Sequence, residues 1–395
     1  MKKIISKILY FFGDLISIIL YIYCYICKIT IVLIREDRFG HQIGTLDSEL
    51  FLATERKEKF KRDTVFLLIE KTDNIANKYL RQISPGIIKD LGFRPKVLKS
   101  KSKYTIFQLF FKNYISENKR FYRSSKVLTP HLKQSLFNDN NTSENILNKL
   151  GIQKEKYICI YSRDSKYLSK RFPDLDWNYH NHRNSDIDNL SALANFITSE
   201  LNLDVVRVGS NAQKAISWSK ETFPKIIDYS FSEYVNDKND IDLIASCSMY
   251  ISNGGGPETV AIAARKEMIR INQTPILQEV GDDFGIYLPM LIRRKIDKSI
   301  LSISEVIDLG IAKTYSFNDY QKINLYIEEN CEIDILNAFK DYLKYRNNNF
   351  DKLERSIINK YKQVREDNEN KGLIIRGFNN FIAPSFLIKY PELLN

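Results

Sequence analysis

A long apolar stretch opens the chain and runs from Ile8 to Cys27 with few interruptions. About twenty residues is the length that crosses a hydrocarbon core, but Asp14 lies in its middle, which a membrane-spanning helix tolerates poorly. Polar or amphipathic side chains recur every three, four or seven residues, at Lys3, Lys7, Tyr10, Asp14, Ser17, Tyr21 and Lys28. This spacing forms one stripe and favours a helix over residues 1–28 that lies in the membrane interface. A single span and a buried globular helix are the alternatives.

Beyond this head, apolar runs alternate with loops and helical patterns. Ile29–Ile34 (ITIVLI) and Thr64–Ile69 (TVFLLI) are runs typical of buried strands, and a helical pattern over residues 47–58 lies between them. Strand, glycine-containing loop, helix and strand is the opening of a parallel α/β domain. We therefore predict a first Rossmann-like domain over residues 29–150, with helical and loop material from the second strand to a polar junction near Asn140.

The alternation is clearer in the second half of the chain. Strands are predicted at Tyr157–Tyr161, Asp204–Val208, Lys225–Tyr229, Met249–Ser252 and Glu267–Asn272. Helices are predicted at Ser185–Leu201 (with Ser185 as a candidate cap), Asp240–Cys247 and 257–265. This order predicts a second Rossmann-like domain over residues 151–345, followed by a charged helix and an apolar end over 346–395 that dock on the body. The predicted fold is α/β, with two Rossmann-like domains facing each other across a cleft.

Composition narrows the possible classes of protein. Hydrophobic residues make up 44% and charged residues 27% of 395, which permits a large core and argues against general disorder. The net charge of +11 favours phosphates, nucleic acid or an anionic membrane. Five scattered cysteines exclude a disulfide framework, and the single C-x2-C at Cys24 and Cys27 excludes a structural zinc site. Basic and aromatic residues interleave over Lys89–Lys126, which suits lipid headgroups or a solvated face.

The strongest local signal is the segment Ser252–Thr259 (SNGGGPET), which follows a predicted strand and opens a helix. Its glycines let the backbone approach a bulky anion, and a helix start offers free N–H groups to phosphate. It matches neither a Walker motif nor G-x-G-x-x-G. The candidate nucleotide-sugar-binding residues here are Asn253, Gly254, Gly255, Gly256, Glu258 and Thr259, with Glu258 a candidate for ribose hydroxyls. A tight structural turn is the alternative.

A second signal is the long loop that begins after the strand ending at Tyr161. Open α/β sheets bind ligands at the carboxyl ends of their strands, and loops of this length are mostly functional. Arginine forks suit a diphosphate. The candidates are Arg163, Asp164, His180, His182, Arg183 and Asn184, with Arg207 at the end of the next strand. The histidines lack an obvious third metal ligand, and the Asp174-x-Asp176 pair lies in a loop, so no metal site is predicted.

A third signal lies in the first βα loop, at Arg38–Gly44 (RFGHQIG), and faces the predicted cleft. His41, Asp47 and Glu49 are candidates for the general base that activates an attacking hydroxyl, with His41 the leading one. The ordinary alternatives are a helix cap for Asp47 and an exposed charge for Glu49.

Together these blocks resemble a family of proposed bacterial glycosyltransferases encoded in surface-polysaccharide gene clusters, with a two-Rossmann (GT-B-like) fold. The resemblance spans roughly residues 35–387 and includes a short I-N motif at Ile271–Asn272. Its main motifs are R-F-G-H-x-x-x-x-L-D-S-E-L-F-L at Arg38–Leu52, R-D-S-x-Y-L at Arg163–Leu168, Y-H-x-H-R-N-S-D-I at Tyr179–Ile187, S-N-G-G-G-P at Ser252–Pro257 and A-P-S-F-L at Ala383–Leu387. The resemblance implies sugar transfer from a nucleotide sugar to a growing glycan.

These inferences combine into one prediction. The chain is expected to be a metal-independent GT-B glycosyltransferase on the cytoplasmic face of the inner membrane, acting in surface polysaccharide synthesis. Its expected partners are a nucleotide sugar as donor substrate, a glycan or lipid-linked acceptor and the membrane surface, with no cofactor and no nucleic acid. The C-terminal domain would bind the donor and the N-terminal domain the acceptor. The alternatives are a sugar-phosphate epimerase or phosphotransferase, and a non-catalytic membrane-bound glycan-binding protein.

Overall fold

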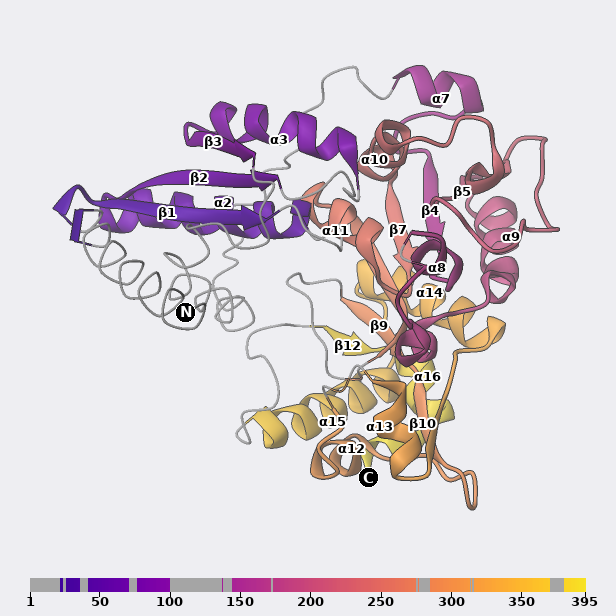
Figure 1. Ribbon diagram of the computed structural model, residues 1–395. Helices are drawn as coiled ribbons and strands as arrows, with labels where there is room; N and C mark the ends of the chain where they lie inside the picture. Colours follow the sequence, from indigo (N-terminus) through magenta and orange to yellow (C-terminus); the bar gives the residue numbers. More distant parts are fainter. Residues whose placement is uncertain are drawn as a thin grey trace. The chain divides into compact units, whose positions relative to one another are not determined.

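The structure is a computed structural model. It describes residues 22–23, 26–35, 42–70, 77–99, 137, 144–171, 173–274, 276, 285–312, 314, 316–369 and 380–395. The chain forms two compact units, Met1–Asn138 and Asp139–Asn395, which divide close to the predicted polar junction (Figure 1). We describe each unit by itself.

The N-terminal unit contains a parallel three-stranded sheet in the order β1-β2-β3. Its elements are β1 (Ile29–Arg35), α2 (Gln42–Phe60), β2 (Asp63–Glu70), α3 (Lys78–Asp90) and β3 (Arg94–Lys99). Helix α2 packs on β1 and β2, and α3 packs on β3. One apolar face of α2 is buried, made by Ile43, Leu46, Leu50 and Ala53 at spacings of three and four residues.

Most of the predicted elements of this unit are confirmed. Both strands and the helix between them are present, although the helix begins at Gln42 rather than Asp47. The prediction of helical and loop material beyond β2 is wrong for β3. Its sequence, RPKVLK, contains two lysines and a proline, so pairing with β2 rather than an apolar pattern makes it a strand.

The C-terminal unit is built on a seven-stranded sheet in the order β12-β9-β8-β7-β4-β5-β6, and every pairing in it is parallel. The strands are β4 (Tyr157–Tyr161), β5 (Asp204–Arg207), β6 (Ile226–Asp228), β7 (Met249–Ser252), β8 (Glu267–Gln273), β9 (Ile286–Pro289) and β12 (Phe381–Ile382). A separate antiparallel pair is formed by β10 (Leu291–Arg294) and β11 (Leu325–Glu328). The five strands predicted for this half are confirmed. The short strands β9 and β12 were not predicted.

The strand order places a topological switch point between β4 and β7. The chain first builds outward from β4 to β5 and β6, then returns to build β7, β8 and β9 on the other side of β4. In open parallel sheets the two connections diverge at such a point and leave a crevice at the carboxyl ends of the strands, where ligands bind. Strands β5 and β7 are buried along their length and β4 in all but its last residue, as expected for a parallel sheet covered on both faces.

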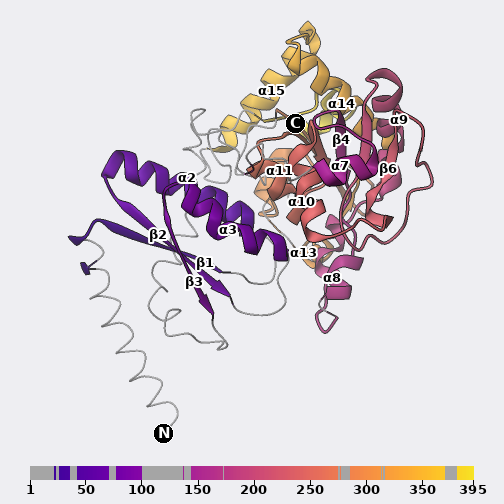
Figure 2. The ribbon, with the colours of Figure 1, turned by 90° about the horizontal axis from the view of Figure 1, so that it is seen from above.

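Helices cover both faces of this sheet. The α-helices of the unit are α7 (Glu144–Leu150), α8 (Lys166–Arg171), α9 (Ser191–Glu200), α10 (Asp237–Ser246), α11 (Gly256–Ala263), α12 (Ile303–Asp308), α13 (Phe317–Lys322), α14 (Glu332–Arg346), α15 (Lys352–Glu369) and α16 (Pro384–Lys389). Its 3-10 helices are η4 (Asn178–Arg183), η5 (Ile187–Leu190), η6 (Tyr229–Phe231) and η7 (Pro391–Leu394). Helices α9 and α14 pack against each other on one face, and α10 and α11 on the other (Figures 1 and 2).

The C-terminal tail is part of this layered body. Strand β12 pairs with β9 at the edge of the sheet, α15 packs on β12, and α16 packs on α14. The Ser385 N–H donates to Asp341 Oδ2 over 2.8 Å, and Lys389 Nζ lies 2.6 Å from Asp334 Oδ1. Both contacts join the tail to α14.

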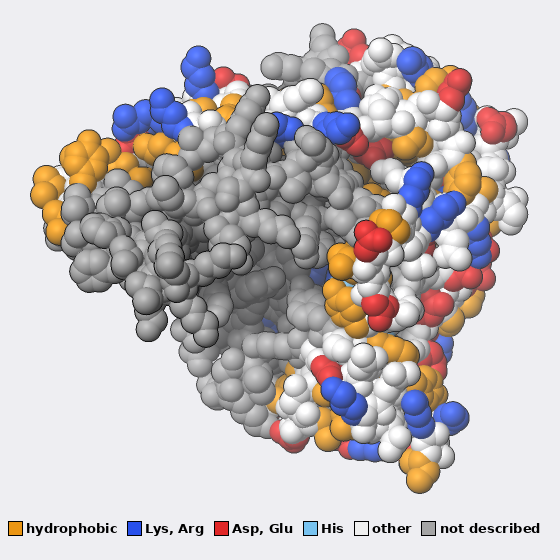
Figure 3. Space-filling model, in the orientation of Figure 1, with side chains coloured by type: hydrophobic (Ala, Val, Ile, Leu, Met, Phe, Trp, Pro, Cys, Tyr) orange, Lys and Arg blue, Asp and Glu red, His pale blue; other side chains and the backbone are white. Residues whose placement is uncertain are grey.

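The predicted helix over residues 1–28 lies mostly outside the described residues. Of this segment, Ile22, Tyr23 and Ile26 are helical and exposed. Among the helices that the structure describes, none combines the length and apolar character needed to cross a membrane. Most of the basic region Lys89–Lys126 also lies outside the described residues. On the face shown in Figure 3, basic and acidic side chains are interspersed over the C-terminal unit.

Candidate functional site

Three sequence segments that were predicted to bind a ligand meet at the switch point. Arg163 follows β4, and Asn253 follows β7. The Arg163 N–H donates to Asn253 Oδ1 over 2.8 Å, and Asn253 Nδ2 donates to the Arg183 carbonyl over 3.0 Å. Asn253 therefore joins the end of β4, the η4 segment and the start of the glycine turn, and we call this junction at the switch point the β4–β7 crevice.

The glycine turn needs glycine at its first two positions because of their backbone conformation, but not at its third. Gly254 and Gly255 have φ of +87° and +123°, in the region that side-chain-bearing residues rarely adopt. A Cβ on Gly255 would lie 3.3 Å from the Tyr161 ring, whereas a Cβ on Gly256 would meet no atom within 4 Å. Gly255 is the N-cap of α11 and has no side chain to accept from the first turn. The open backbone at Gly256 thus leaves the helix start approachable by an anion.

Tyr161, the last residue of β4, supports the loops on either side of it. Its ring lies beneath Gly255 after β7 and beneath Gly209 after β5, where an added Cβ would come within 2.8 Å of a ring carbon. Gly209 also has a φ of +117°. Burial raises the pKa of Tyr161 to about 12, so the phenol stays neutral. Both loops are therefore held close to the carboxyl end of β4.

The crevice contains two arginines that lie close to each other. Arg163 is buried, and its Nη1 donates to the His180 carbonyl over 3.4 Å and to Asn184 Oδ1. Burial, and then the positive charge of Arg183, hold the pKa of Arg163 below its usual range. Within the described residues, both hydrogen bonds of the Arg163 guanidinium leave from Nη1.

Both histidines of η4 are neutral at pH 7. Burial, followed by the charges of Arg183 and Arg163, lowers the pKa of His180 to about 4. Burial and Arg183 lower the pKa of His182 to about 4 as well. The His182 ring stacks on Phe317, with 6.2 Å between the ring centroids. The positive charge of the crevice therefore comes from the arginines, with the imidazoles as neutral neighbours.

Three other predicted ligand-binding residues have partners inside the protein. Glu258 is buried and forms an ion pair with Arg270 of β8. Thr259 Oγ1 donates to the Gly256 carbonyl over 2.7 Å. Arg207 is 2% exposed, and its Nη1 lies 2.9 Å from Oδ1 of Asp228 in β6. Their roles toward a ligand stay predictions.

The catalytic candidates belong to the N-terminal unit. His41 lies outside the described residues. Asp47 lies inside α2, which begins at Gln42, so it is not the helix cap. Glu49 is buried rather than exposed, with its Oε2 at 3.6 Å from Arg56 Nη1. Both ordinary interpretations of these carboxylates are therefore wrong, and their catalytic roles stay predictions.

Sequence reasoning missed the residues that hold the crevice together. Asn272 Nδ2 donates to Ser185 Oγ over 2.7 Å, and the Ser185 N–H donates to the Arg163 carbonyl over 3.0 Å. Asn272 and Asn330 also exchange hydrogen bonds of 2.7 and 2.5 Å between their amide side chains and backbones. Ser185 is therefore not a helix cap, and α9 begins later, at Ser191. The I-N motif at Ile271–Asn272 marked Asn272 in the sequence, but it did not indicate that Ser185 and Asn330 are its partners.

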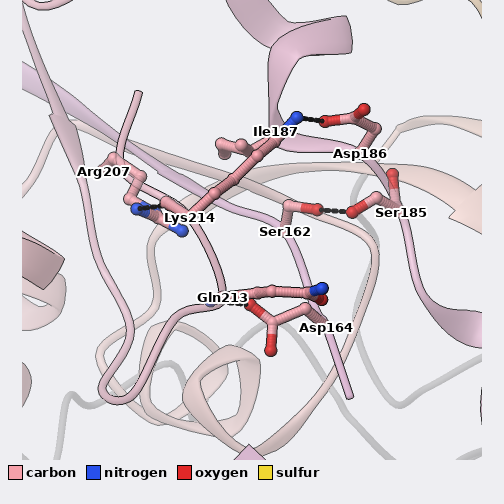
Figure 4. A pocket seen from close by; sticks show the side chains of 8 residues that line it. All are labelled: Ser162, Asp164, Ser185, Asp186, Ile187, Arg207, Gln213 and Lys214. Atoms are coloured by element: carbon pink, nitrogen blue, oxygen red, sulfur yellow. Dashed lines mark hydrogen bonds and ion pairs between the residues drawn. The ribbon is translucent and has the colours of Figure 1, made fainter. Parts of the chain in front are cut away.

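A cavity of about 250 Å³ lies beside the crevice, between the carboxyl ends of β4 and β5 (Figure 4). It is lined by Ser162 and Asp164 after β4, residues 185–187 after η4, and Arg207, Gln213 and Lys214. Figure 4 shows Ser162 and Ser185 between the Lys214–Asp186 ion pair and the contact of Asp164 with Gln213. Asp164 thus forms part of the cavity wall.

In the part of the chain that the structure describes, no three His, Cys, Asp or Glu side chains are grouped so that they could hold a metal ion. Asp176 of the D-x-D pair accepts the Asn178 N–H over 2.9 Å, which is a turn contact at the start of η4.

Comparisons with known proteins give weak matches only. No family model and no curated protein matches the sequence. The solved structure of E. coli ADP-heptose LPS heptosyltransferase II matches with a TM-score of 0.35 and 13% identity, over 66% of this chain and 91% of that chain. E. coli heptosyltransferase WaaC with ADP-2-deoxy-2-fluoro heptose matches with a TM-score of 0.29 and 9% identity, over 70% and 96%. At TM-scores this low, the similarity establishes neither fold nor function.

Proposed function

We propose that the protein is a GT-B glycosyltransferase whose β4–β7 crevice binds the diphosphate of a nucleotide sugar. It would transfer the sugar to a glycan or lipid-linked acceptor at the cytoplasmic face of the inner membrane, in surface polysaccharide synthesis. The observation that carries this proposal is that the segments of Arg163, Arg183 and the glycine turn meet at Asn253, at the switch point of a parallel sheet, with the charge of Arg183 acting on Arg163.

The energetics of the crevice favour an anionic ligand. Bringing two guanidinium groups together in a partly desolvated place costs free energy, and a diphosphate between them would offset that cost. Guanidinium forks and the N–H groups of a helix start are the donors that proteins use for phosphate oxygens. A neutral sugar alone would leave the repulsion in place.

The same groups would stabilise the departing nucleoside diphosphate. As the glycosidic bond to the donor phosphate breaks, negative charge develops on the leaving oxygen, and fixed cations and amide dipoles lower the energy of that state. In this proposal the arginines supply the charge that a metal ion supplies elsewhere. His41, Asp47 and Glu49 remain the candidate bases for the acceptor hydroxyl.

Calorimetry with ADP, GDP, UDP and their sugars tests the proposal. Arg163→Ala should weaken binding of the cognate nucleotide at least tenfold, since hydrogen bonds to charged groups contribute about 1.5–3 kcal/mol. Gly256→Ala should also weaken it, because the added methyl enters the space at the helix start where nothing else lies within 4 Å. Arg355→Ala, at an exposed position of α15, is the matched control.

Two results would contradict the proposal. The first is wild-type protein that binds none of these nucleotides. The second is binding that is equally tight in Arg163→Ala, Gly256→Ala and the control. Where a nucleotide sugar does bind, its turnover without any acceptor would favour a sugar-phosphate epimerase or phosphotransferase instead.

A further inference from the structure

The cavity between β4 and β5 is separated from the diphosphate crevice by a single residue. Ser162 and Asp164 line the cavity, while Arg163 between them is not part of its wall and contacts Asn184 and the His180 carbonyl. A ligand held at the crevice would therefore have the cavity as its immediate neighbour. Any group attached to a bound diphosphate on this side would enter it.

The cavity is the size of a single ring. Its volume of about 250 Å³ is below the roughly 300–1,000 Å³ of pockets that enclose drug-sized ligands. A complete nucleotide sugar does not fit, but a pentose or hexose ring does. Ile187, which is 3% exposed, adds an apolar contact for the carbon face of such a ring.

The charges of the wall do not favour a phosphate. Arg207 is paired with Asp228 at 2.9 Å, and Lys214 lies 2.7 Å from both Asp186 and Asp188. Within the described residues, both cations of this wall are thus matched by carboxylates. This differs from the crevice, where two arginines lie close together.

The wall presents oriented acceptors instead. Asp164 Oδ1 accepts the Lys166 N–H over 2.9 Å, and Oδ2 accepts the Gln213 N–H over 2.8 Å. Two backbone amides therefore hold this carboxylate still. Each carboxylate oxygen can accept a second hydrogen bond, and hydroxyl groups are the donors that match it. Gln213 contributes a side-chain amide from the exposed loop after β5.

We propose that this cavity binds the vicinal hydroxyls of a sugar ring of the donor, with Asp164 as principal acceptor and Gln213 as second contact. The inference rests on the proposed function, because it presumes that the diphosphate lies in the crevice. The ring is either the transferred sugar or the ribose of the nucleotide, and the two share the same hydroxyl chemistry.

The test measures calorimetric affinities for ADP, GDP and UDP, for their 2′-deoxy forms and for the corresponding nucleotide sugars. Asp164→Asn and Gln213→Ala are the variants, and Gln153→Ala, at another exposed glutamine, is the matched control. The Gln213 side chain can be removed without removing the backbone N–H that holds Asp164, so this variant should fold even where Asp164→Asn does not.

Each pattern of results has one meaning. If the cavity holds the transferred sugar, both variants lose about tenfold in affinity for the nucleotide sugar and keep their affinity for the diphosphate. If it holds the ribose, both ligands lose affinity equally, and the 2′-deoxy nucleotides bind wild type and variants alike. Unchanged affinities with binding that still depends on Arg163 overturn this inference alone. Wild-type protein that binds no nucleotide overturns the proposed function, and this inference with it.

Discussion

Asp240, in the first turn of α10, makes the stability of the C-terminal unit depend on pH in a direction that can be calculated. Its Oδ1 accepts the Tyr229 hydroxyl over 2.7 Å, and its Oδ2 accepts Ser210 Oγ over 3.0 Å. Burial raises its pKa from 3.8 to about 6. Ser210 belongs to the loop after β5 that carries Gln213 into the cavity, so this carboxyl also holds part of the proposed sugar site.

The sign follows from which state binds the proton more tightly. Between about pH 4 and pH 6 the folded protein keeps the proton on Asp240 while the unfolded chain releases it. The stabilising contribution is therefore complete below pH 4 and is lost as the pH rises through 6. This difference in pKa between the folded and unfolded states corresponds to about 3 kcal/mol. Asp240 keeps some solvent contact, so a value of about 1–3 kcal/mol is expected after screening.

Asp240→Asn removes this titration while keeping an acceptor for the tyrosine hydroxyl. The assay is the free energy of unfolding in urea, measured for wild type and variant at intervals from pH 4 to pH 8. The stability of the variant relative to wild type should rise by about 1–3 kcal/mol across this range. Asp174→Asn, at an exposed loop aspartate, should show no such trend. A difference between Asp240→Asn and wild type that stays constant with pH would refute the reasoning.

Three further predictions concern the glycine turn and the helix that follows it. Glu258→Ala leaves the buried Arg270 guanidinium without its ion-pair partner, so the free energy of unfolding should fall by about 3–5 kcal/mol in urea denaturation; a loss below 1 kcal/mol would show that the pair is not needed. Gly255→Ala forces a side chain into a φ of +123° and against the Tyr161 ring, and should cost about 1–3 kcal/mol in the same assay. Gly256→Ala should leave stability unchanged and affect nucleotide binding only, so equal losses from both substitutions would contradict the assigned geometry.

The prediction of elements succeeded where a strand is buried on both faces. Tyr157–Tyr161 and Met249–Ser252 are uninterrupted apolar or small-residue runs, and both are strands. It failed where neighbours impose the strand. Residues 94–99 and 381–382 pair with β2 and β9 but have no pattern of their own. Such strands are short or polar, and hydrogen bonding with the adjacent strand decides their conformation.

The candidate site residues also divide into those that the local sequence indicated and those that only long-range contacts revealed. Arg163, Arg183 and the glycine run could be chosen from residue type and from their places after predicted strands, and the structure brings them together at Asn253. The internal partners of Glu258 and Arg207 could not be predicted, because they come from other elements of the fold. Arg270 lies on β8 and Asp228 lies on β6. Asp164 and residues 185–187 of the cavity wall belong to motifs, whereas Gln213 and Lys214, which complete the wall, belong to none.

The sequence by itself determined the local elements, because periodicity, glycines and caps act over a few neighbouring residues. It also determined the inventory of charged groups that can meet an anion. Only the tertiary structure decided that β4 lies beside β7, and that Arg207 and Arg270 form ion pairs inside the protein. The physical reason is that strand order and ion pairing depend on contacts between residues far apart in the chain, and these form only when the sheet is assembled.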